Sequence, residues 1–95
     1  MPQQVRVWPP FYARLAVVCN VEQELEIVGR RLPSIETTFS EEWDTECQPV
    51  PGQGPEWRFL TVVLDSGVLA AIFARRSDVD PDAVEIRNIT VMPTP

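Results

Sequence analysis

The sequence predicts a small α+β domain, with a mostly antiparallel sheet of about five to six strands and one amphipathic helix packed on one face. Short runs rich in β-branched and aromatic residues are separated by turn residues along the chain. One segment has a clear helical periodicity. The chain has 95 residues, 44% of them apolar, which suits one core, so we expect a single domain over residues 1–95.

The sequence predicts a strand near the N-terminus, followed by a segment that fits either a strand or a helix. Val5 to Trp8 alternates apolar and polar residues, which is typical of a half-buried strand. Pro9 and Pro10 end this strand, because proline has no amide hydrogen to donate to a ladder. Residues 11–19 (FYARLAVVC) favour a strand covered on both faces, because two valines are adjacent and the run is short. A helix initiated by the prolines is the alternative.

The best-defined element is a helix that begins after Asn20 and ends before Pro33. Asn20 with Gln23 three residues later resembles a capping box. Acidic residues in the first turns and arginines in the last turn both complement the helix dipole. The apolar residues recur at spacings of four, three and four and therefore share one face: Val21, Leu25, Val28 and Leu32.

The middle of the chain predicts a short strand followed by a long loop. Residues 34–39 alternate Ile35, Thr37 and Phe39, which favours a strand. An irregular acidic and proline-rich loop is expected at about residues 40–56, because that stretch has no apolar period. Loops of this kind often carry function.

The C-terminal part predicts a hairpin and a last strand. Residues 57–64 and 68–74 are rich in β-forming residues, and Gly67 between them suits the left-handed position of a three-residue hairpin loop. Residues 84–91 (VEIRNITV) favour a final strand.

Composition restricts the classes of partner and chemistry. The net charge is −6, from fourteen acidic and eight basic residues, and there is no histidine. Nucleic acids and anionic membranes require a basic footprint, so we expect neither as a partner and favour a protein with a basic surface. Histidine is the usual general base and the commonest metal ligand, so we expect no catalytic residue, metal or cofactor.

The chain carries no pattern that directs it out of the cytoplasm. The first residues do not show the basic, then apolar, then small-residue pattern of a secretion signal, so we expect none, and the apolar runs are too short to span a bilayer. Cys19 and Cys47 have no spacing that demands a disulfide. A cytoplasmic location is the simplest expectation.

Two clusters are candidate binding sites. The first combines carboxylates with an aromatic anchor and suits a partner-binding surface: Glu41, Glu42, Trp43, Asp44 and Glu46. Its alternative is a solvated acidic turn whose tryptophan packs on the core. The second consists of arginines that can hold a carboxylate or phosphate: Arg58, Arg75 and Arg76. Pairing with nearby acidic residues is the alternative for these arginines.

Residues 57–91 also resemble part of a known protein class. Their order (WRFLTVVL, a turn, VLAAIFARR, a loop, VEIRNITV) is loosely similar to the C-terminal sheet of RelE- or BrnT-type bacterial toxins. The similarity covers about a third of the chain and rests on the strand pattern and the three arginines. It implies a small ribonuclease whose arginines stabilise phosphate charge.

Three functional hypotheses follow. The leading one is a non-enzymatic protein-binding module (an inhibitor, immunity or antitoxin-like protein, or a small subunit of a complex) whose acidic face binds a basic partner. The second is the toxin-like ribonuclease. The third is a homodimer without catalytic activity, formed when the exposed sheet edge pairs across a two-fold axis.

Overall fold

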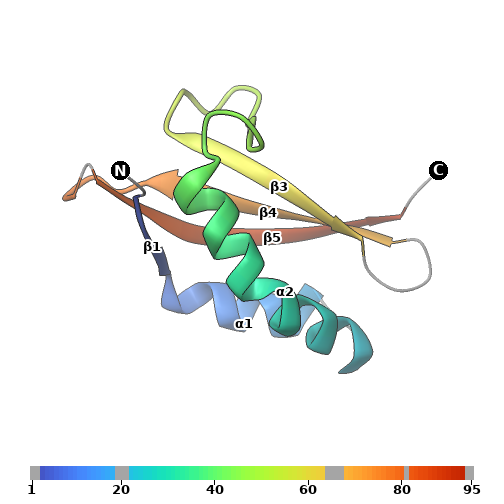
Figure 1. The fold of residues 1–95 in the computed structure, drawn as a ribbon. Coiled ribbons are helices and arrows are strands. Elements are labelled where there is room, and N and C mark those ends of the chain that lie inside the picture. Colours follow the sequence, from blue (N-terminus) through green and yellow to red (C-terminus); the bar gives the residue numbers. More distant parts are fainter. Residues whose placement is uncertain (1–2, 19–21, 64–67, 81, 94–95) are drawn as a thin grey trace.

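The computed structural model describes residues 3–18, 22–63, 68–80 and 82–93 and has an α+β fold (Figure 1). The elements follow in the order β1 (Gln4–Val7), α1 (Pro9–Val18), α2 (Glu22–Glu41), β2 (Gln48–Pro49), β3 (Trp57–Val63), β4 (Val68–Arg76) and β5 (Ala83–Pro93). The predicted fold class is confirmed, with two helices in place of the single helix expected.

The sheet has five strands in the order β1-β5-β4-β3-β2. Neighbouring strands are antiparallel, except that β1 pairs with β5 in parallel, with Val5 opposite Val84. The two strands predicted as a hairpin, β3 and β4, pair over their length, from Trp57 opposite Arg75 to Val63 opposite Leu69. The predicted turn at Gly67 lies outside the described residues.

A bulge in β5 sets which of its side chains face the core. Phe73 is opposite Asn88 and Ala74 is opposite Ile86, so Arg87 is an extra residue on β5. Ile86 and Ile89 are three residues apart, yet both are fully buried. An uninterrupted strand would place them on opposite faces, because side chains alternate along a strand.

The segment after the first strand is helical, so the strand favoured for residues 11–19 is wrong, and its alternative is correct within the described residues. Phe11 and Leu15 are four residues apart and both are buried, which is the spacing of one helix face. Pro9 and Pro10 occupy the first turn, where an amide hydrogen has no partner inside the helix.

The second helix continues through Pro33 to Glu41, so the predicted stop at Pro33 and the strand at residues 34–39 are both wrong. Val28, Ile35 and Phe39 are buried on one side of α2, and their spacings of seven and four are helical. Burying such side chains contributes about 1.5–3 kcal/mol each, which offsets the roughly 3 kcal/mol cost of an interior proline. The predicted cap at Asn20 lies outside the described residues.

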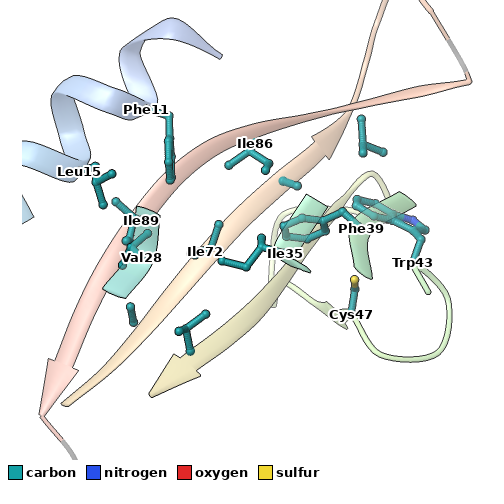
Figure 2. Packing of buried hydrophobic residues seen from close by; sticks show 14 residues of the cluster. Phe11, Leu15, Val28, Ile35, Phe39, Trp43, Cys47, Ile72, Ile86 and Ile89 are labelled. Carbon is teal, nitrogen blue, oxygen red and sulfur yellow. The ribbon is translucent and has the colours of Figure 1, made fainter. Parts of the chain in front are cut away.

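Both helices contribute to one core on one face of the sheet (Figure 2). Phe11 and Leu15 of α1 lie near Ile89 of β5, and Ile35 and Phe39 of α2 lie over the opposite part of the cluster. The other face of the sheet has no helix over it in the described part of the chain. Thr61 and Val63 are exposed there, which fits the alternation along β3.

Candidate functional site

The last residue of α2 and the five residues after it form a tight acidic turn, defined here as residues 41–46. The amide of Glu42 donates to the carbonyl oxygen of Thr38 at 2.8 Å, and the amide of Glu46 donates to that of Glu42 at 2.9 Å. All four carboxylate residues predicted for the partner-binding surface are exposed here: Glu41, Glu42, Asp44 and Glu46. The structure therefore brings the predicted acidic residues together on one short turn.

Trp43, the predicted aromatic anchor, does not share this exposure. Its side chain is 4% exposed and packs against Phe39, with 6.0 Å between the ring centres (Figure 2). The guanidinium groups of Arg58 and Arg76 lie 5.9 and 5.6 Å from the centre of the Trp43 ring. Trp43 thus occupies the core, as in the alternative considered from the sequence, and the acidic turn presents carboxylates without an aromatic side chain.

Arg58 connects β3 to the acidic turn. One guanidinium nitrogen, Nη1, donates to the carbonyl oxygen of Trp43 at 3.1 Å and to that of Cys47 at 2.9 Å. Its other terminal nitrogen lies 3.7 Å from a carboxylate oxygen of Asp44, whose side chain is largely exposed. A charged donor that bridges two carbonyl groups fixes the path of the backbone between them. The backbone that carries these carboxylate residues is therefore positioned by a residue of the sheet.

The thiol at the end of the turn is not a nucleophile at neutral pH. Burial raises the pKa of the Cys47 thiol to about 11, against the opposing effect of the nearby positive charge on Arg58. Its Sγ atom lies 3.9 Å from the carbonyl oxygen of Thr38. A thiolate is the reactive form of cysteine, and this environment disfavours it.

The three arginines predicted as an anion site are not brought together. Arg58 and Arg76 face the helices and flank Trp43, whereas Arg75 follows the opposite alternation on β4. Arg75 donates to a carboxylate oxygen of Asp78 at 2.7 Å, which raises the pKa of Arg75 and lowers that of Asp78. This arrangement favours internal pairing and does not support one phosphate site built from all three side chains.

A groove is lined by residues of α1, of β3 and β5, and by the residue that follows β1. It has a volume of about 580 Å³, and Trp8, Arg14, Trp57, Arg87 and Asn88 contribute to its lining. The guanidinium of Arg87 lies 4.0 Å from the centre of the Trp8 ring and donates to Glu85 at 3.0 Å. The sequence pattern of residues 11–19 favours a strand, and a strand would not place Pro10, Ala13, Arg14 and Val17 along one groove, so the groove is not predicted from the sequence.

The described residues offer no metal centre and no membrane span. Among them, no group of three or more His, Cys, Asp or Glu side chains is placed to hold a metal ion. None of the helices in the described part of the chain is long and apolar enough to cross a membrane. No protein-family model matches the chain, and no curated protein or solved structure is significantly similar to it.

Proposed function

We propose that this chain is a non-enzymatic protein-binding module whose acidic turn binds a basic surface of a partner protein. The observation that carries the proposal is that four exposed carboxylate residues lie on one turn whose backbone is held by Arg58: Glu41, Glu42, Asp44 and Glu46. A backbone held in one conformation loses little conformational entropy when a partner binds. An inhibitor, an immunity or antitoxin-like protein, or a small subunit of a complex would use such a surface.

The charge distribution supports a basic partner. The whole chain has a net charge of −6, so its long-range field attracts positive surfaces. Within the acidic turn, Asp44 alone has an ion pair among the described residues, at 3.7 Å from Arg58. The remaining carboxylates are free to meet lysine or arginine side chains of a partner, and such contacts increase the association rate and the specificity.

The test compares two variants that lose the same charge at different places. In the first, the carboxylates of the turn become amides: Glu41→Gln, Glu42→Gln, Asp44→Asn and Glu46→Gln. The control neutralises four other acidic residues: Glu26→Gln, Glu36→Gln, Glu56→Gln and Asp82→Asn. Each tagged protein is used to purify partners from its native cell lysate at low and at high salt.

We expect the unmodified chain and the control to retain a stoichiometric protein partner at low salt and to release it at high salt. The Debye length falls from about 10 Å at 0.1 M salt to about 3 Å at 1 M, so exposed charge pairs are screened. The turn variant should lose this partner at both salt concentrations. Equal retention by the two variants would remove the acidic turn from the function.

A second candidate, a homodimer, is favoured by the edge of the sheet. The short strand β2 pairs only with Arg58 and Phe59, so residues 60–63 of β3 have no strand partner on that side among the described residues. Val63 is 58% exposed, and no charged side chain lies within residues 60–63 to protect the edge. Antiparallel pairing with a second copy would satisfy these backbone groups across a two-fold axis.

Light scattering after size-exclusion chromatography tests this second candidate. A dimeric mass that becomes monomeric in the Val63→Lys variant would support edge pairing, because a lysine on an exposed edge disfavours pairing with a second strand. A monomeric mass for the unmodified chain at high concentration would exclude it and leave the partner-binding module.

A further inference from the structure

The first helix carries two stripes of different character. Phe11 and Leu15 form the buried stripe that faces the core. A second stripe lies on another side of the helix, at spacings of three, one and three residues, and all its members line the groove: Pro10, Ala13, Arg14 and Val17. A solvent-facing stripe of a helix is ordinarily polar, yet three of these four residues are apolar and Val17 is 68% exposed.

Two indoles extend this apolar surface onto the sheet. Trp8 follows β1 and is 38% exposed, and Trp57 begins β3 and is partly exposed. Both line the same groove as the stripe on α1. The groove has a volume of about 580 Å³ and is widely open to solvent, so a ligand bound there would be only partly covered. Tryptophan side chains offer large apolar contact areas at little cost in conformational entropy.

The charge of the groove is opposite to that of the chain as a whole. Its lining includes Arg14 and Arg87 but no acidic residue, although the chain has a net charge of −6. Arg87 is held by Trp8 and Glu85, so its orientation is fixed. Arg14 is exposed and has no hydrogen bond or ion pair with the described residues, so its guanidinium is available to a ligand.

We propose that this groove binds a small organic carboxylate with a flat apolar body. The body would lie against Trp57 and the apolar stripe of α1, and the carboxylate would accept hydrogen bonds from Arg14 and from the side-chain amide of Asn88. A carboxylate suits the site because a guanidinium can donate to both of its oxygens. The groove lies apart from the acidic turn, so the inference is independent of the proposed partner binding.

The probe is 2-naphthoate, and the neutral 2-naphthamide is its matched control. The chain has three tryptophans, and the indole N–H signals in a ¹H–¹⁵N NMR spectrum, assigned with Trp8→Phe and Trp57→Phe variants, report on them separately. Titration with 2-naphthoate should shift the indole signals of Trp8 and Trp57. The signal of the buried Trp43 should stay in place, because Trp43 is not part of the groove lining.

The Arg14→Gln variant tests the recognition of charge. Removing a charged hydrogen bond should weaken the affinity for 2-naphthoate about tenfold and leave the affinity for 2-naphthamide unchanged. Arg30→Gln is the control, because Arg30 is an exposed arginine on α2 outside the groove. Arg14 is on the surface, and an unchanged spectrum of the free variant will show that the fold is intact.

Two results would overturn the proposal. If the indole signals of Trp8 and Trp57 do not move at millimolar 2-naphthoate, the groove is not a binding site for this class of ligand. If 2-naphthoate and 2-naphthamide bind equally well and Arg14→Gln changes neither affinity, the groove binds apolar rings without recognising a carboxylate.

Discussion

The guanidinium of Arg58 lies 5.9 Å from the centre of the Trp43 ring and donates to the carbonyl oxygen of the same residue at 3.1 Å. Arg76 approaches the same ring at 5.6 Å. Trp43 therefore belongs to the core and also forms part of the turn that displays the carboxylates. The surface proposed to bind a partner and the packing of the sheet consequently depend on one residue.

Replacing Trp43 by alanine should destabilise the fold strongly. Truncating a buried aromatic side chain costs about 3–5 kcal/mol, and here it also removes the ring that faces the two arginines. Urea denaturation followed by circular dichroism measures the free energy of unfolding. Tyr12→Ala is the control, because Tyr12 is 53% exposed, and it should cost much less. Similar losses in both variants would contradict the buried position of Trp43.

Replacing Pro33 by alanine should stabilise the fold. Proline in a helix interior is about 3 kcal/mol less favourable than alanine, and this difference already includes the smaller freedom of the unfolded proline chain. Pro33 is exposed, so little packing is lost. We expect the free energy of unfolding to rise by about 3 kcal/mol in a urea titration. A decrease would indicate that α2 is interrupted at Pro33, as the sequence predicted.

The thiol of Cys47 should react slowly while the chain is folded. Its pKa is raised from 9.0 to about 11, so at pH 8 the thiolate fraction falls about a hundredfold. Iodoacetamide labelling, with mass spectrometry of the peptide that contains Cys47, measures the rate in buffer and in urea. The rate in urea should be at least about a hundredfold higher, because exposure adds to the recovery of thiolate. Equal rates would show that the thiol is accessible in the folded chain.

The ion pair between Arg75 and Asp78 should make stability depend on acid pH. The hydrogen bond from Arg75 lowers the pKa of Asp78 below its ordinary value of 3.8. The pair therefore contributes stability above pH 3.8, and the contribution is lost as the pH falls through the folded-state pKa. Asp78→Asn should reduce stability slightly at pH 7, and its effect should become smaller as the pH falls below 3.8, as measured by urea denaturation. If the difference in the free energy of unfolding between the two proteins does not change with pH, the charge of Asp78 is not its cause.

Several helices and strands could be predicted from local sequence patterns alone. The strands β3, β4 and β5 were predicted because β-branched and aromatic residues cluster in runs of strand length between turn residues. The first part of α2 was predicted because its apolar residues recur at helical spacing and its charged residues are placed to complement a helix dipole. For the acidic candidate site, the carboxylates could be listed from the sequence because they are adjacent along the chain.

The errors share one origin, which is that short apolar runs fit two periodicities. Ile35 and Phe39 are separated by four residues, a spacing that suits both an alternating strand and one helix face. Proline ordinarily ends a helix, but the burial of Ile35 and Phe39 beyond Pro33 stabilises α2, and this burial does not follow from the local sequence. Residues 11–19 also fit both a strand and a helix. The apolar stripe on α1, and the groove that it lines, could therefore not be predicted.

The α+β class, the net negative charge and the acidic residues of the turn could be predicted, because they follow from composition and from neighbours along the chain. The burial of Trp43, the approach of Arg58 and Arg76 to its ring and the opposite orientation of Arg75 could not, because they arise when the chain folds. These relationships join residues that are distant in sequence. Strand register and the packing of helices on one face fix them, and both depend on the free energy of the whole core.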